Sequence, residues 1–186
     1  DVVDLEWVQV GDIRIYKYEA SRPDATPAHM GNLSGRACSK PGVVPWSELS
    51  FDEARVACAL GGWRLCLISE WQLACGGPAR TRYPYGNNYD EQACNGREAG
   101  QQENDVAATG DHEATCESAY GVVDMSGNLK EWTGSPAGDD NDPVHLIIGG
   151  AYDNALEASL SCDNRGIPRE DGFRFPNLGF RCCKTP

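Results

Sequence analysis

The sequence lacks any apolar run long enough to cross a membrane, because its hydrophobic residues, 40% of the chain, stand in short stretches. No secretory leader is recognisable, and the opening "DVVDLEW" indicates a mature or trimmed chain. Positive charge is scarce: 16 Lys and Arg residues stand against 28 Asp and Glu residues, a formal net charge of −12. Such a surface repels a phosphate backbone, so we expect no nucleic-acid partner.

Common metal and hydrolase motifs are missing as well. Only His29, His112 and His145 occur, scattered singly, and no two cysteines form the short CxxC pair of a zinc site. The spacing of an EF-hand loop is absent, and no Ser-His-Asp arrangement has a supporting context. These absences argue against zinc, EF-hand calcium and serine-hydrolase chemistry.

What the chain does have is cysteine, with nine in 186 residues, among 21 Gly and 11 Pro. Spread cysteines in a loop-rich chain indicate disulfides and an oxidising compartment. We therefore expect a secreted, periplasmic or cell-surface protein. Because the number is odd, at least one thiol is free or is paired outside the chain.

We expect a single domain over residues 1–186 with sparse regular structure. Alternating residues from Val8 to Tyr18 predict two strands, or one strand bent near Gly11. The segments "HLIIGGAYD" and "LGFRCCK" predict late strands. From residue 77 to about 145 no periodicity is visible, so turns and loops pinned by disulfides, bound ions or both are expected there.

Two helices are predicted. In "LSFDEARVACALGG" Ser50 caps the first helix, Glu53 completes a capping box and the two glycines stop it. A second, short helix is predicted around "EWQLAC", with Ser69 as its cap and the Gly76–Gly77 pair as its end.

Six segments in order carry a resemblance: "VPWSELSFDEARVAC", "GGWRLCLISEWQLAC", "YPYGNNYD", "YGVVDMSGNLKEW", "IIGGAYDN" and "NLGFRCC". Together they resemble the formylglycine-generating enzyme, or sulfatase-modifying factor, family over roughly residues 8 to 184. The resemblance implies an α+β fold related to C-type lectins. Such a fold has two short helices, twisted antiparallel strands, much irregular chain and stapling disulfides.

The resemblance also implies two structural disulfides that join the helices to the C-terminal part of the chain: Cys58–Cys182 and Cys75–Cys162. Neighbouring Cys182 and Cys183 point to opposite faces if they lie on a strand, so they should have different partners.

Five cysteines receive no partner from the resemblance. Cys94 and Cys116 bracket the irregular region and are paired by elimination. Among Cys38, Cys66 and Cys183 one further pair is expected, with Cys38 as the favoured member, although the sequence does not say which pair it is.

The segment "DMSGNLKEW" is the predicted metal site. Calcium takes carboxylate and carbonyl oxygens, and a tight turn between two acids offers both. The resemblance implies these ligands: the side chains of Asp124 and Glu131 and the carbonyls of Gly127 and Leu129. A second calcium site of some relatives is matched at its start by Asn95 and the carbonyl of Gly96. The alternative is a turn whose acids face water or cap backbone N–H groups.

The family's catalytic cysteines have no counterpart. Enzymes of the family use two cysteines, five residues apart, that hold Cu(I) and follow a Gly-Gly-Ser strand. Counting back from Cys162 places Tyr152 and Glu157 at these positions, and no cysteine lies between Cys116 and Cys162. Iron-dependent relatives need a histidine cluster, which is also missing. We therefore predict no catalytic residues and no copper.

The predicted function is a non-catalytic, calcium-stabilised binding module for an unknown protein or carbohydrate ligand. Aromatic residues suggested for a binding face are Tyr83, Tyr85, Tyr89, Tyr152 and Phe175, with Tyr83 and Tyr85 favoured as core. Two alternatives stay open: a copper-dependent oxidoreductase or other enzyme of altered chemistry, and a structural part of a surface assembly bridged by the unpaired cysteine.

Overall fold

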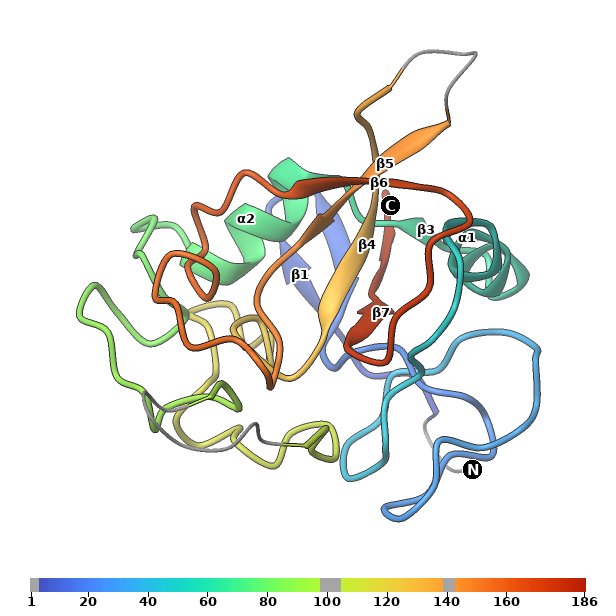
Figure 1. The fold of residues 1–186 in the computed structure, drawn as a ribbon, viewed down its shortest axis with the longest axis horizontal. Coiled ribbons are helices and arrows are strands. Elements are labelled where there is room, and N and C mark those ends of the chain that lie inside the picture. The colour runs from blue at the N-terminus through green and yellow to red at the C-terminus, as the bar shows by residue number, and fades with distance from the viewer. Residues whose placement is uncertain (1–3, 98–104, 139–142) are drawn as a thin grey trace.

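The computed structural model describes residues 4–97, 105–138 and 143–186, which form two four-stranded sheets and two helices (Figure 1). The first sheet has the strand order β1 (Trp7–Val10), β2 (Ile13–Tyr16), β8 (Cys182–Lys184) and β3 (Arg64–Leu65). The second sheet has the strand order β6 (Ile167–Glu170), β5 (Val144–Ile148), β4 (Lys130–Pro136) and β7 (Leu178–Phe180). Strand pairs are antiparallel except β4 with β7.

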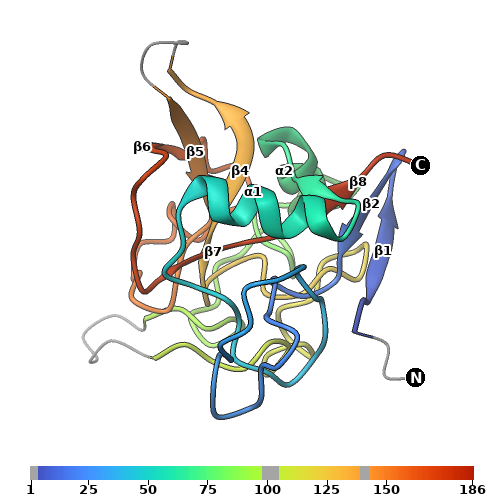
Figure 2. The ribbon, with the colours of Figure 1, turned by 90° about the vertical axis from the view of Figure 1, so that its right-hand side faces the viewer.

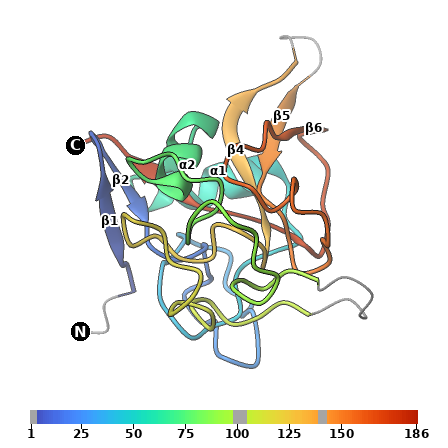
Figure 3. The same cartoon turned by 90° about the vertical axis from the view of Figure 1, so that its left-hand side faces the viewer.

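The end of the chain connects the two sheets. A single residue, Arg181, separates β7 in the second sheet from β8 in the first. The helix α1 (Phe51–Leu60) packs against β3 and β4, and α2 (Ile68–Gly76) packs against β1 and β4. Irregular loops gather on one side of the molecule, away from the helices (Figures 2 and 3).

The first helix starts as predicted. The side chain of Ser50 accepts a hydrogen bond from the Glu53 N–H, and the Glu53 carboxylate accepts one from the Ser50 N–H at 2.8 Å. This reciprocal pair satisfies donors that the first turn leaves free. Beyond Leu60 the chain leaves the helix at Gly61 and Gly62, and Gly62 has a positive φ of 75°.

The predicted cap of the second helix is wrong. The helix begins at Ile68, and its N-cap is Leu67 rather than Ser69. The Glu70 carboxylate accepts a hydrogen bond from the Leu67 N–H at 2.8 Å, so it performs the cap's task. Arg64 holds that carboxylate in place through two bonds of 2.6 and 2.7 Å.

The prediction of turns and loops from residue 77 to 145 is wrong at β4, an inner strand of the second sheet. Its sequence, "KEWTGSP", shows no alternation because Glu131, Trp132 and Thr133 are all buried, whichever face they lie on. Neighbouring strands fix β4: Glu131 is paired with Ile148 on one side and with Gly179 on the other. The short strands β3 and β6 were not predicted either.

Two apolar clusters form the core. One surrounds Trp46, Trp132 and Phe180, and lies between α1 and the second sheet. The other surrounds Trp71 and Met125 and includes residues of α2 and of the first sheet. Both clusters contain disulfide cysteines, so covalent bonds run through the packed interior.

Four disulfides link the described chain: Cys58–Cys182, Cys66–Cys183, Cys75–Cys162 and Cys94–Cys116. Three of them are the pairs expected above. The expectation that Cys38 belongs to the fourth pair is wrong, because the pairing of β3 with β8 places Cys66 beside Cys183. All nine cysteines lie in the described residues, and Cys38 is the one free thiol, fully buried.

Candidate functional site

The turn predicted to bind calcium has an unusual backbone. Asp124 and Asn128 have positive φ values of 60° and 56°, and Gly127 has one of 87°. Residues with a side chain rarely adopt this region, so a turn that holds Asp124 and Asn128 there needs support from outside itself.

One support is Glu19, a fully buried residue that follows β2. Its carboxylate accepts hydrogen bonds from the Leu129 N–H at 2.9 Å and from the Asn128 side-chain amide. The Asn128 side-chain oxygen in turn accepts from the Asn95 side chain at 3.0 Å and from the Ala107 N–H at 2.9 Å. This network brings the two predicted calcium segments into contact, although Glu19 itself was not predicted.

The second support is Arg181. Its guanidinium binds the Glu131 carboxylate, with Nη2 to Oε1 at 3.0 Å and Nε to the two oxygens at 3.2 and 3.3 Å. The indole N–H of Trp71 donates to the same carboxylate at 2.8 Å. The side chains of Arg181 and Glu131 are 0% and 1% exposed. The remaining N–H groups of Arg181 donate to the carbonyls of Tyr16, Lys17 and Val123.

Asp124 completes a buried group of three carboxyls around one guanidinium. It accepts a hydrogen bond from the Gly110 N–H at 2.8 Å. Burial raises the pKa of Asp124 to about 6, against the lowering effects of the Gly110 bond and Arg181. Burial, with Asp124 and Glu131 nearby, raises the pKa of Glu19 well above its usual value.

Two of the predicted calcium ligands, Asp124 and Glu131, belong to this buried group. Both oxygens of Glu131 face Arg181 and Trp71, so one predicted carboxylate is already bound to a protein cation. Within the described ranges no group of three or more His, Cys, Asp or Glu side chains is arranged to hold a metal. As folded, the donor set fits the guanidinium rather than calcium. Calcium binding stays a prediction of the resemblance.

The second predicted calcium site begins at Asn95 and Gly96. The Asn95 side-chain amide donates to Asn128 and to the Asp105 carbonyl, and the main-chain carbonyl of Asn95 accepts from the Asn128 N–H at 2.8 Å. The loop lies so close to Gly127 that a side chain on Gly127 would collide with Asn95. These contacts show a packing role for Asn95 and leave its calcium role a prediction.

The region where the family's catalytic thiols are expected carries other chemistry. Beside Tyr152, the Lys130 ammonium lies 3.6 Å from an Asp153 carboxylate oxygen. The other carboxylate oxygen of Asp153 accepts a hydrogen bond from the Asn177 amide at 2.7 Å. Burial lowers the pKa of Lys130, and Asp153 opposes that shift. This partly buried ion pair contains no thiol that could bind copper.

The free thiol of Cys38 does not replace the missing pair. It is buried, and burial raises its pKa, against the lowering effect of Arg36. A thiol of this kind is a poor nucleophile and a poor metal ligand at neutral pH.

The aromatic residues suggested for a binding face are distributed differently. Tyr83 is fully buried, stacks on Tyr85 at 5.5 Å and contacts Tyr89 at the same centroid distance. Phe175, in contrast, stacks on Phe173 in the loop before β7. Tyr83, Tyr85 and Tyr89 therefore form one local cluster, and Phe175 belongs to another.

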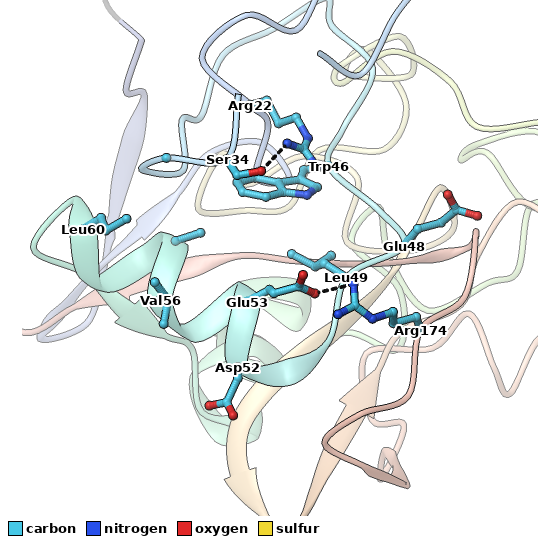
Figure 4. Close-up of a pocket in the computed structure, with 12 residues that line it drawn as sticks. Arg22, Ser34, Trp46, Glu48, Leu49, Asp52, Glu53, Val56, Leu60 and Arg174 are labelled. Carbon is cyan, nitrogen blue, oxygen red and sulfur yellow. Dashed lines mark hydrogen bonds and ion pairs between the residues drawn. The ribbon is translucent and has the colours of Figure 1, made fainter. Parts of the chain in front are cut away.

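A cavity of about 250 Å³ lies between α1 and the irregular chain before it (Figure 4). The apolar part of its lining is Trp46, Leu49, Val56, Ala57 and Leu60. The charged part is Arg22, Glu48, Asp52, Glu53 and Arg174. The sequence analysis did not predict this site.

Two apolar residues of α1, Val56 and Leu60, were the sequence signal for this cavity. Phe51, Ala54 and Ala57 form the buried face of the helix, whereas Val56 and Leu60, four residues apart, are 44% and 62% exposed. Apolar residues at that spacing outside the core face are typical of a contact surface.

Comparison with known proteins places the chain in a family. The profile described as "Sulfatase-modifying factor enzyme 1-like domain" matches residues 6–186. Inactive C-alpha-formylglycine-generating enzyme 2 of Mus musculus is 29% identical over 155 residues, which is 76% of this chain and 49% of the relative. Formylglycine-generating enzyme of Bos taurus is 26% identical over 162 residues, which is 74% of this chain and 43% of the relative.

A solved structure shows the same fold. PvdO from Pseudomonas aeruginosa superposes with a TM-score of 0.67 at 17% identity, covering 94% of this chain and 80% of that one. The chain spans about half the length of the curated relatives it matches. The family match, the two helices, the two sheets and the four disulfides together show that the chain belongs to the formylglycine-generating enzyme, or sulfatase-modifying factor, family.

Proposed function

We propose that this chain is a non-catalytic binding domain of its family. The observation that carries the proposal is the state of its thiols. Eight of the nine cysteines form disulfides, and the ninth, Cys38, is buried within the described chain. Copper-dependent oxidation by this family needs a pair of available thiolates, and this chain has no such pair to offer. The similarity to a relative named as inactive supports the same reading.

The proposed location is outside the cytoplasm, as a secreted or cell-surface protein. Four disulfides are typical of proteins that fold in an oxidising compartment. Neither helix of the described chain has the length and apolar character needed to cross a bilayer.

The cavity beside α1 is the proposed ligand site. It combines a concave apolar lining with a few charged groups, which is the usual composition of a binding pocket. The alternative of an assembly bridged by the unpaired cysteine is less favoured, because the Cys38 thiol is buried and cannot reach another chain without unfolding around it.

An oxidation assay tests the loss of catalysis. The chain is incubated with Cu(I), oxygen and a cysteine-containing sulfatase peptide, and conversion of the peptide thiol to an aldehyde is followed by mass spectrometry. Formylglycine-generating enzyme of Bos taurus, assayed in parallel, shows that the conditions support turnover. We expect no aldehyde above the copper-only background. Repeated turnover by this chain would overturn the proposal.

A further inference from the structure

We infer that the cavity beside α1 receives an apolar side chain of a basic peptide segment in a protein partner. The inference rests on the proposed binding role and adds the chemistry of the ligand.

The size and walls suit one side chain. The cavity, about 250 Å³, falls below the range of about 300–1,000 Å³ typical of pockets for drug-sized ligands. The indole of Trp46 forms one wall and the aliphatic side of α1 forms the other, with Val56 and Leu60 at its surface (Figure 4). An aliphatic or aromatic side chain inserted here would bury apolar surface on both sides.

Two neighbouring side chains, Arg22 and Phe180, hold the Trp46 indole in position. The Arg22 guanidinium lies 4.2 Å from the centre of the Trp46 ring and donates to the Ser34 hydroxyl at 3.0 Å. Trp46 also packs edge-on against Phe180 at 5.7 Å. The wall of the cavity is therefore rigid, and binding requires little reorganisation of the protein.

The rim favours a cation. Arg174 is already bound to Glu53 at 2.7 Å, and Arg22 is held against Trp46. Asp52 meets only Arg55, its neighbour on the exposed face of α1. The Glu48 side chain, at the end of the cavity near Arg174 (Figure 4), is exposed, and among the described residues its carboxylate has no hydrogen-bond or ion-pair partner. The lining carries three carboxylates and two guanidinium groups, so a lysine or arginine beside the inserted side chain adds a favourable contact.

The charge of the whole molecule acts in the same direction. A net charge of −12 attracts basic partners over distances of about 10 Å or more at low salt. The occupant that fits both the cavity and this field is a short segment with an apolar residue between lysines or arginines.

Three labelled peptides of equal length test the inference by fluorescence anisotropy: GKLKG, GQLQG and GELEG. We expect GKLKG to bind most tightly and GELEG most weakly, with the difference shrinking as salt is added. Equal or tighter binding of GELEG would overturn the inferred charge of the partner. No binding of any of the three at millimolar concentration would overturn the site.

Two variants locate the binding. Leu60→Asn should weaken GKLKG binding about tenfold or more, because it places a polar amide on the apolar wall without adding a charge. Leu156→Asn is the matched control, since Leu156 is 72% exposed and does not line the cavity, and it should leave binding unchanged. Glu48→Gln should weaken GKLKG about threefold and leave GQLQG unaffected. Equal effects of Leu60→Asn and Leu156→Asn would contradict the assigned location.

The result of the peptide-binding experiment can be distinguished from the result of the oxidation assay. If no peptide binds and no aldehyde forms, the ligand class is lost and the non-catalytic assignment stands. If aldehyde forms, the proposed function fails whatever the peptides do.

Discussion

Arg181 is the residue on which the buried polar group depends. Its guanidinium pairs with Glu131, and Asp124 and Glu19 also lie within its field. Replacing Arg181 by Met should lower the free energy of unfolding by about 3–5 kcal/mol, because the Glu131 charge is then buried without a partner. Urea denaturation followed by tryptophan fluorescence measures this loss.

A double variant separates charge from packing. Adding Glu131→Gln to Arg181→Met removes the unpaired charge and keeps an oxygen that accepts from Trp71. The double variant should regain part of the lost stability. If Arg181→Met alone costs less than about 1 kcal/mol, the buried pair does not have the role given to it here.

Asp124 should make stability depend on pH. Its pKa is raised from 3.8 to about 6 in the folded protein, so the proton is held between about pH 4 and 6 only in the folded state. The stabilisation of the folded state by this proton is fully present below about pH 4 and is lost as the pH rises through 6. Asp124→Asn should therefore gain stability relative to the wild type at pH 7, by roughly 1–2 kcal/mol, and lose that advantage near pH 4.

The comparison is made by urea denaturation at pH 4, 5, 6 and 7. Asp12→Asn, at an exposed position between β1 and β2, controls for the removal of one negative charge. An advantage of Asp124→Asn that is the same at every pH would show that Asp124 does not titrate as described.

At the scale of elements, the turn before β4 is held by protein groups. Glu19, Asn95 and Arg181 supply the partners of its backbone and side chains. Because these partners come from the protein itself, we expect EDTA to leave the melting temperature unchanged within about 1 °C. Differential scanning fluorimetry with EDTA or added calcium measures the melting temperature. A fall of several degrees with EDTA, reversed by calcium, would support the calcium binding that the family resemblance implies.

The disulfide Cys94–Cys116 links two positions within the irregular central segment. It closes a loop with a sequence separation of 22 residues, so replacing both cysteines by serine should cost about 3 kcal/mol in the entropic model. Cys38→Ala removes a cysteine without a disulfide and should cost distinctly less. Urea denaturation compares the two variants. Equal losses would mean that the crosslink itself contributes little.

The sequence predicted the elements that have a local pattern. The capping box of α1, the alternation in β1 and β2 and the apolar runs of β5 and β7 are visible within a few residues. The strand β4 was not predicted because Glu131, Trp132 and Thr133 are all buried, so its hydrophobic pattern has no period.

The roles of Glu19 and Arg181 were not predicted because their partners are distant in sequence. Glu19 is 110 residues from Leu129, and Arg181 is 50 residues from Glu131. A lone arginine inside the apolar run "LGFRCC" was the available signal for Arg181.

The molecule as a whole has the fold of its family, and eight of its nine cysteines form disulfides. Four disulfides join the helices, the first sheet and the irregular loops, and the remaining cysteine is buried. The proposal that the chain lacks oxidase chemistry rests on this distribution of cysteines.

A count of thiols that react with Ellman's reagent tests this claim most directly. The native protein, purified without reductant, should show no fast-reacting thiol, and the same protein in guanidinium chloride should show one per chain, from Cys38. Two or more thiols reacting in the native state would contradict the account, because a free pair would then be available to bind copper.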